Sequence, residues 1–164
     1  MYTLNNFFIY SILGFLFETI GNIIIGSHGE SGILFGPWTP VYGFGIIVSF
    51  YINKKLENKI KKRKLKNVIL FLTTTIILTI LEQIGGMLIE AIWNTSFWDY
   101  TKLKFNIGKY ISLETSLLWG IGSVLITNYL KSYTDKLNKK IPKVITYILT
   151  ISLVIDVILA LFIK

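Results

Sequence analysis

Long apolar blocks alternate with short polar segments along most of the chain. A helix that crosses a bilayer needs about 20 predominantly apolar residues. The pattern therefore predicts an all-α integral membrane protein with five transmembrane helices, which form a single transmembrane domain over residues 1–164. The expected helices cover residues 4–25, 39–53, 67–93, 112–130 and 144–163.

Two basic segments predict the orientation of these helices. Residues 54–66 hold eight Lys/Arg residues and residues 131–143 hold five, out of 17 in the chain. Loops rich in Lys and Arg stay on the cytoplasmic side of a membrane. Five spans place both segments on that side, with the N-terminus cytoplasmic and the C-terminus outside. The basic segments have a functional alternative as docking sites for anionic lipid or for a cytoplasmic partner.

Composition agrees with a multi-pass membrane protein, whose first partner is the lipid bilayer. The chain is 52% hydrophobic and 16% charged, whereas soluble domains are about 25% charged. Because the +8 net charge is concentrated in the two basic segments, we expect no nucleic-acid binding. The chain has no cysteine and one histidine, His28. We therefore expect no metal site, no cofactor, no catalytic residue and no enzymatic activity. The first apolar block has no basic n-region and is expected to be a retained helix.

Residues 26–45 are too rich in Gly and Pro to form a regular helix throughout. Two interpretations remain open. The segment dips into the membrane as a re-entrant loop, or it is an interfacial turn that leads into the second helix at Pro40. The structural loop residues are predicted to be Gly32, Gly36, Pro37, Pro40, Tyr42 and Gly43.

Acidic residues inside the apolar blocks are the main candidates for function, because such residues are energetically costly in a membrane. Glu18, Glu82 and Asp156 would lie at similar depth, roughly 20 Å from the basic side. If the helices are neighbours, these three acids converge with Glu90 and Glu114 on one site that opens outward. The carboxyl groups are protonated, satisfied by polar neighbours, or bound to a cation. We call residues 94–111, which five spans place outside, the outer loop, and its lysines could reach Glu90 or Glu114. The structural alternative is that the acids only fasten helices together, and Asp156 could instead face a partner subunit.

The loop that follows residue 93 carries further candidate ligands, namely Trp98, Asp99, Tyr100 and Asn106. Trp98 and Tyr100 are equally typical of an interfacial aromatic belt. Asp99 is suited to cap a turn, and Asn106 with Gly108 has the composition of a turn. Both interpretations remain open here.

Several motifs together resemble a known family. The runs Gly32-Ile33-Leu34-Phe35-Gly36-Pro37 and Pro40-Val41-Tyr42-Gly43-Phe44-Gly45 resemble the signature of the CmpB-like, putative ABC-transporter type IV family, which consists of small membrane proteins of Firmicutes. Further matches within residues 8–125 are Ser11, Gly14, Glu18, Glu82, Glu90, Trp98-Asp99-Tyr100, Phe105-Asn106, Gly108 and Trp119-Gly120. The chain departs from the family pattern at Ser31 and Gln83, where Arg and Tyr are usual.

The resemblance implies a permease-like transport subunit of a bacterial plasma membrane, whose substrate is not specified. The acid positions place its polar site in the outer half of the bilayer. Since the chain has no Walker-type phosphate loop, a separate cytoplasmic ATPase subunit would supply ATP hydrolysis. A bundle this small also suggests a homo-oligomer. Two other functions remain open: a stand-alone proton- or cation-coupled carrier, and a non-transporting accessory protein that binds lipid or scaffolds a membrane complex.

Overall fold

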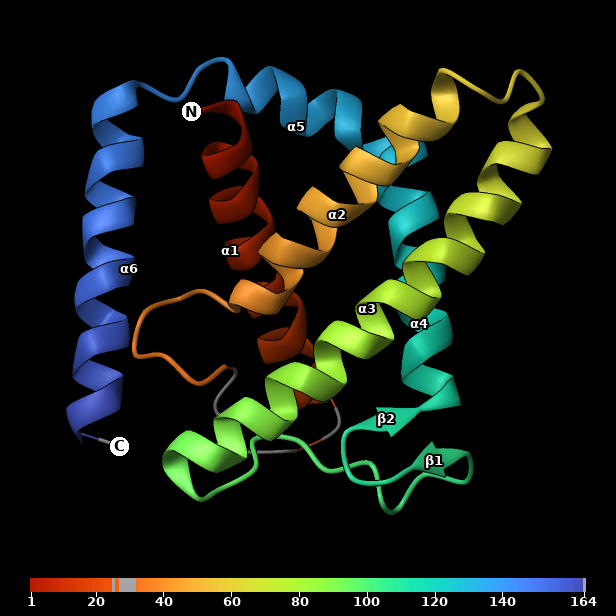
Figure 1. Ribbon diagram of the computed structural model, residues 1–164. Helices are drawn as coiled ribbons and strands as arrows, with labels where there is room; N and C mark the ends of the chain where they lie inside the picture. The colour runs from red at the N-terminus through yellow and green to blue at the C-terminus, as the bar shows by residue number, and fades with distance from the viewer. Residues whose placement is uncertain (25, 27–31, 164) are drawn as a thin grey trace. The chain divides into compact units, whose positions relative to one another are not determined.

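The computed structural model describes residues 1–24, 26 and 32–163, and it is mostly helical (Figure 1). His28, Ser31 and the rest of residues 27–31 in the predicted Gly/Pro segment lie outside the described residues. The elements in order are α1 (Tyr2–Ile24), α2 (Pro40–Glu57), α3 (Arg63–Trp93), β1 (Asn106–Ile107), β2 (Ile111–Ser112), α4 (Leu113–Leu125), the π-helix η1 (Ile126–Leu130), α5 (Lys131–Asn138) and α6 (Lys143–Ile163).

Three of the described helices are long and apolar enough to cross a membrane, namely α1, α3 and α6. The second predicted span corresponds to α2, which continues to Glu57 within the first basic segment. The fourth corresponds to α4, which has only 13 residues before the backbone changes to η1. Membrane crossing by these two segments stays a prediction. Residues 131–143 were expected to be the second basic loop. The first part of this segment instead forms the short amphipathic helix α5.

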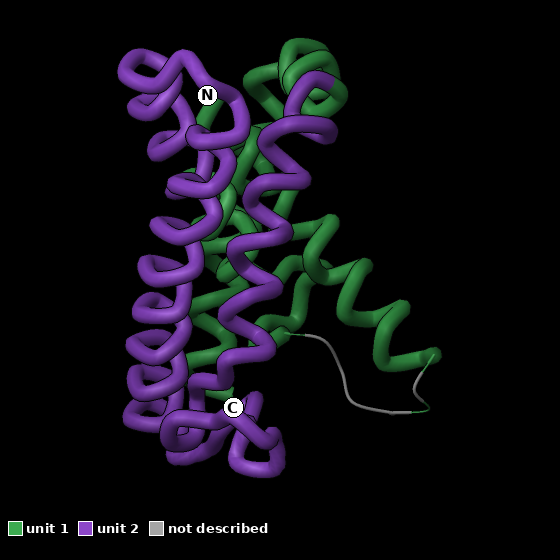
Figure 2. Tube along the Cα trace, turned by 90° about the vertical axis from the view of Figure 1, so that its right-hand side faces the viewer, with its two compact units in different colours: residues 1–47, 133–164 green, residues 48–132 purple. Residues whose placement is uncertain are grey.

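The described chain divides into two compact units, which Figure 2 shows in green and purple. The first unit comprises residues 1–47 and 133–164, and the second comprises residues 48–132. The boundaries fall inside α2 and α5, where the helical backbone continues from one unit into the other.

Polar side chains join the helices of the first unit. Asn5 in α1 accepts a hydrogen bond from Thr146 Oγ1 of α6 at 2.5 Å and donates one to Asn138 Oδ1 of α5 at 3.2 Å. Close packing joins α1 to α2, since a Cβ atom on Gly43 would lie 2.3 Å from Ser11 Oγ. Gly43 therefore allows the two backbones to approach closely, as small residues do between membrane helices.

In the second unit, α3 packs along α4 (Figure 1). A Cβ atom on Gly120 would lie 2.1 Å from Thr75 Oγ1 and 2.7 Å from Phe71 Cδ2. Ser49 of α2 and Ser123 of α4 share a hydrogen bond of 2.9 Å. At the start of α4, Ser112 Oγ accepts a hydrogen bond from Thr115 N at 3.1 Å and caps the helix.

The burial pattern is that of a protein surrounded by apolar solvent. Small polar residues such as Ser11, Ser49 and Thr74 are fully buried, whereas Phe17 and Ile24 are 72% and 76% exposed. Water would disfavour this arrangement, but lipid does not. The exposed apolar surface therefore agrees with the three apolar helices in indicating a membrane protein.

Candidate functional site

The buried carboxylate of Glu82 is the centre of the most complete polar site in the second unit. Glu82 lies in α3 and is 6% exposed. Its Oε1 accepts a hydrogen bond from the Tyr100 hydroxyl at 2.9 Å, and its Oε2 accepts one from Trp119 Nε1 at 3.1 Å. One carboxylate thus joins α3, the outer loop and α4. We call Glu82, Tyr100 and Trp119 the Glu82 cluster.

Aromatic rings continue this site one helical turn further along α3. A Cβ atom on Gly86 would lie 2.4 Å from Cγ of Tyr110, so the ring packs directly on the helix backbone. Tyr110 is 3% exposed, and Trp98 meets it edge to face with ring centroids 5.9 Å apart. Tyr110 was not among the site residues predicted from the sequence, and Trp119 was named only in the family motif. The adjacent glycines 85 and 86, one turn from Glu82, were the available signal for a ring packed there.

Local turn chemistry holds the loop that carries Tyr100. Asp99 Oδ1 accepts hydrogen bonds from Thr101 N at 2.8 Å and Thr101 Oγ1 at 2.6 Å. Both hydrogen bonds lower the pKa of the Asp99 carboxyl group below its usual range, and the bond from the Thr101 hydroxyl has the larger effect. Asn106 Nδ2 donates to Gly108 O at 2.9 Å, and Gly108 has φ +67°. Both residues therefore shape the loop, which is the turn role that the sequence predicts for them.

The short strands complete the same loop. Asn106 pairs with Ser112, and Ile107 pairs with Ile111, in an antiparallel two-stranded sheet. Tyr100 N also donates to Lys109 O at 2.8 Å. Backbone hydrogen bonds thus hold the main chain of Tyr100, whose side chain reaches Glu82.

Glu90 lies two turns beyond Glu82 and is ion-paired. Lys109 Nζ lies 2.5 Å from Glu90 Oε1, so a lysine of the outer loop does reach this acid. The hydrogen bond to Glu90 raises the pKa of Lys109. Glu114, in the first turn of α4, has one carboxylate oxygen that is buried and has no hydrogen-bond partner among the described residues.

Glu18 has a different environment in the first unit. The Tyr42 hydroxyl donates a hydrogen bond to its Oε1 at 3.1 Å. The Tyr42 ring lies over Gly14, where a Cβ atom would be 2.4 Å from Cγ of the ring. Tyr42, which was predicted to be a structural loop residue, thus lies in the first turn of α2 and joins it to α1.

Asp156 of α6 binds the end of the Gly/Pro segment. Its two carboxylate oxygens accept hydrogen bonds from Phe35 N at 2.9 Å, Gly36 N at 2.8 Å and Trp38 Nε1 at 2.8 Å. Asp156 is 6% exposed. A partner subunit was one contact expected for this residue, but the carboxylate is occupied within its own unit. The sequence contained a signal for this contact, namely an acid in an apolar helix and an irregular segment rich in backbone donors. The two lie 118 to 121 residues apart in the chain.

The acids that the sequence predicts to converge have separate hydrogen-bond partners. Glu82 and Glu90 belong to the second unit, and Glu18 and Asp156 belong to the first. Within the described ranges, no group of three or more His, Cys, Asp or Glu side chains is arranged to hold a metal ion.

Neutral donors surround three of these acids. In residues 1–24 and 32–163, Glu18, Glu82 and Asp156 have no Lys or Arg partner, and their donors are hydroxyl, indole and backbone N–H groups. A carboxylate with only neutral donors keeps its negative charge uncompensated when it is ionised. Such a group can take up a proton or a cation, whereas Glu90 already has a counter-charge in Lys109.

The comparisons with known proteins place the chain in one family. The family model described as "Putative ABC-transporter type IV" matches residues 5–163, which is nearly the whole chain. No curated protein and no solved structure matched the chain. The match includes α6 with Asp156, which the motifs in the sequence did not reach. The chain belongs to this ABC-transporter-related family of membrane proteins.

Proposed function

We propose that the chain is a permease-like subunit of a transport system in a bacterial plasma membrane, with the Glu82 cluster as its polar recognition site. The observation that carries this proposal is the environment of Glu82. The carboxylate is almost fully buried in an apolar helix, and among the described residues only Tyr100 and Trp119 donate to it. Ionisable residues inside membrane helices commonly mark substrate or ion pathways.

The composition of the site favours a cation or the cationic part of a substrate. A positive group that approached Glu82 would replace one of the two neutral donors and compensate the charge. The neighbouring rings of Trp98 and Tyr110 add aromatic faces, and such faces attract cations. The Glu90–Lys109 ion pair would lie at the outer rim and fasten the loop. Glu114, with its unpartnered oxygen, would be a second acceptor at the start of α4.

The proposal includes five spans, with the N-terminus inside and both basic segments cytoplasmic. The Glu82 cluster then lies in the outer half of the bilayer, and its site opens outward. The basic side would meet a separate ATPase subunit, since the chain has no Walker-type phosphate loop. Because the described residues form only a small bundle, we include a homo-oligomer in the proposal.

Reconstitution of the purified protein tests the role of Glu82. We would compare wild type, Glu82→Gln and the control Asp135→Asn in liposomes loaded with a pH-sensitive dye. Each protein would be tested alone and with any ATPase that co-purifies with it. We expect no dye response from the chain alone, and an ATP hydrolysis rate of the complex that changes severalfold in Glu82→Gln only. An unchanged rate in Glu82→Gln would contradict the proposed site.

The same experiment distinguishes the stand-alone carrier. A proton- or cation-coupled carrier would collapse an imposed pH or K⁺ gradient without ATP, and Glu82→Gln would abolish that flux. Such a result would replace the permease-subunit proposal.

A second candidate function has its own supporting observation. Glu18, Glu82, Glu90 and Asp156 each join elements of their own unit, as Asp156 joins α6 to residues 35–38. This arrangement also suits a non-transporting accessory protein that binds lipid or scaffolds a complex. That function predicts that carboxylate-to-amide changes alter stability but leave the activity of the partner complex unchanged.

A further inference from the structure

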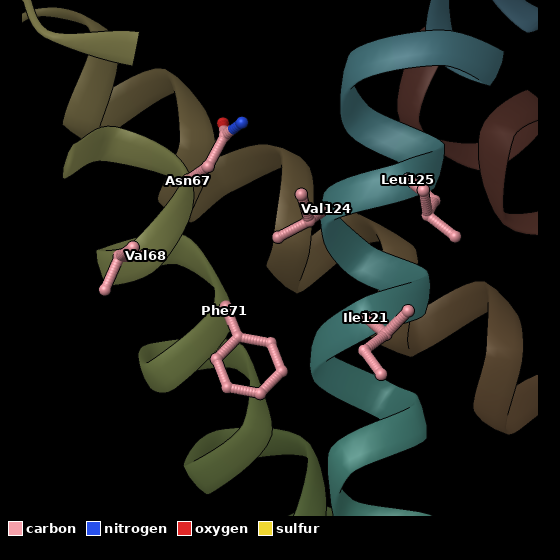
Figure 3. Close-up of a pocket in the computed structure, with 6 residues that line it drawn as sticks. All are labelled: Asn67, Val68, Phe71, Ile121, Val124 and Leu125. Atoms are coloured by element: carbon pink, nitrogen blue, oxygen red, sulfur yellow. The ribbon is translucent and has the colours of Figure 1, made fainter. Parts of the chain in front are cut away.

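An open apolar groove lies between α3 and α4 in the second unit (Figure 3). Its volume is about 260 Å³. The side chains that line it are Asn67, Val68, Phe71, Ile121, Val124 and Leu125, and only Asn67 among them is polar. Val68, Ile121 and Leu125 are each about half exposed, so the groove opens on the outer surface of the helix pair.

Two contacts define the ends of this groove. At one end, Gly120 brings α4 against Phe71, where a Cβ atom would lie 2.7 Å from the ring. At the other end, Asn128 Nδ2 donates to Asn67 Oδ1 across 3.2 Å. The groove is therefore a fixed gap between two points at which the helices are joined.

The second of these contacts comes from the π-helical segment. The wider turn of η1 is shown by Lys131 N, which donates to Ile126 O five residues earlier. Asn128 Nδ2 also donates to Val124 O at 2.8 Å, beside the groove. Single π-helical turns inside α-helices occur frequently at functional sites. Here the turn lies beside the groove and provides the polar contact that closes one end of it.

A basic pocket follows the groove on the same helix. It has a volume of about 350 Å³ and is lined by Glu57, Ile60, Lys61, Arg63 and Lys66. Lys66 is ion-paired with Glu57 at 3.1 Å. Asn53 also donates to Glu57, and this hydrogen bond lowers the pKa of the Glu57 carboxyl group. The pocket therefore has two further positive charges, Lys61 and Arg63. Both are exposed, and neither has an ion-pair or hydrogen-bonding partner for its side chain in the part of the chain that the structure describes.

The pocket and the groove are adjacent along α3, because Lys66 lines the pocket and the next residue, Asn67, lines the groove. Arg63 precedes Asn67 by four residues and Phe71 by eight, so the three share one face of the helix. The charged end of this face is roughly 6 Å from the start of the groove at the usual helical rise. A basic pocket followed by an apolar groove matches the chemistry of a lipid with an anionic headgroup. Basic pockets between membrane helices on the cytoplasmic side bind such headgroups.

We propose that this face of α3 and α4 is a specific site for one anionic phospholipid of the surrounding bilayer. The phosphate lies in the basic pocket between Lys61 and Arg63, and one acyl chain lies in the groove beside Phe71 and Ile121. Asn67 lies where the headgroup meets the acyl chain. The inference rests on the membrane-embedded arrangement in the proposed function, but it does not require transport or an ATPase.

Native mass spectrometry of the full chain in mild detergent tests this site. The protein is titrated with phosphatidylglycerol and, separately, with phosphatidylcholine that has the same acyl chains. We expect wild type to bind one phosphatidylglycerol about tenfold more tightly. The variant Lys61→Gln/Arg63→Gln should lose about 10- to 30-fold of that affinity, because each basic residue near the membrane surface contributes about a factor of five. The control Lys139→Gln/Lys140→Gln removes the same charge from exposed positions of the other basic segment and should bind normally.

A second pair of variants tests the groove. Ile121→Trp fills it and should weaken phosphatidylglycerol binding, whereas Ile76→Trp, at an exposed position of α3 outside the groove, should not.

Equal binding of the two lipids by wild type would overturn the proposal. Undiminished binding by Lys61→Gln/Arg63→Gln would also overturn it, and so would complete displacement of the lipid by equimolar inorganic phosphate. A change of oligomeric state in Ile121→Trp with unchanged lipid binding would assign the groove to a second copy of the chain. The lipid titration uses the chain without any ATPase, so the lipid site and the transport proposal can fail separately.

Discussion

The Tyr100 hydroxyl donates a hydrogen bond of 2.9 Å to Oε1 of Glu82, which lies 18 residues earlier in the chain. Of the two residues, only Glu82 lies in an apolar helix. The outer loop is thus fastened to α3 at a point where a free carboxylate would be unfavourable. Trp119 donates to the other oxygen of the same carboxylate and adds α4 to the connection. This arrangement makes the Glu82 cluster both a structural joint and a candidate binding site.

Removal of single donors to Glu82 should destabilise the second unit. Tyr100→Phe and Trp119→Phe each delete one hydrogen bond, and we expect each to lower the free energy of unfolding by about 1 kcal/mol. Tyr147→Phe is the control, because Tyr147 is 56% exposed. The measurement is unfolding in mixed micelles of mild detergent and SDS. Equal effects of all three substitutions would mean that the hydrogen bonds to Glu82 do not contribute.

Asp156→Ala should release the segment around residues 32–38. The substitution deletes the acceptor for two backbone N–H groups and the Trp38 indole. We expect hydrogen exchange at Phe35 and Gly36 to rise at least tenfold, because these amides lose their side-chain acceptor. Trp38→Phe keeps both backbone hydrogen bonds and should leave that exchange nearly unchanged. If exchange is already fast in wild type, the contacts of Asp156 do not hold this segment in solution.

Two glycines in α4 should respond in opposite directions to the same substitution. Gly120→Ala forces the new Cβ atom against Thr75 and Phe71, and we expect a loss of about 1–3 kcal/mol of stability. At Gly122, by contrast, a new Cβ atom would meet no neighbour within 4 Å. Gly122→Ala should therefore be neutral or stabilising by up to about 1 kcal/mol. Comparable losses at both positions would show that the close packing of α3 on α4 is not maintained in the membrane.

The outer loop should stay ordered at neutral pH and open at both extremes. The Asp99 carboxyl has a lowered pKa, so its contribution is present above the pKa of the unfolded chain and is lost as the pH falls through the folded value. The Lys109 ammonium has a raised pKa. Its contribution is present below the usual value of 10.5 and is lost as the pH rises through the folded value.

Because the chain has no cysteine, a spin label at Ile107→Cys reports on this loop alone. We expect restricted label motion at pH 7 and a mobile spectrum once the pH rises through the folded pKa of Lys109, which lies above 10.5. Lys109→Gln should be mobile already at pH 7 and show no alkaline step. Persistence of the alkaline step in Lys109→Gln would assign the transition to another group.

The long helices and the local turns could be predicted from the sequence, because both depend on neighbouring residues. The apolar blocks locate α1, α3 and α6 within a few residues. The bonds of Asp99 to Thr101 and of Asn106 to Gly108 span two residues each, and residue type alone suggests them. The Glu90–Lys109 pair could be predicted in part, because the outer loop carries lysines near that end of α3.

The partners of the buried acids could not be predicted, because they depend on which helices are neighbours. Trp119 is 37 residues from Glu82, and Trp38 is 118 residues from Asp156. A single sequence does not specify such distant pairs. Whether several acids share one site depends on the same distant pairs, so that expectation stays a prediction. Within the units, Glu18, Glu82 and Glu90 have separate partners. The helix α5 was missed because its polar composition is also typical of a loop.

The central claim is that this chain works as the membrane subunit of a transport complex. Purification of the tagged protein from its native membranes in mild detergent, with quantitative mass spectrometry of what accompanies it, tests this claim most directly. We expect a cytoplasmic ATPase in a fixed ratio to the chain, retained in Glu82→Gln and lost when the basic segment at residues 54–66 is neutralised. A protein that purifies alone, as a monomer or homo-oligomer, would contradict it.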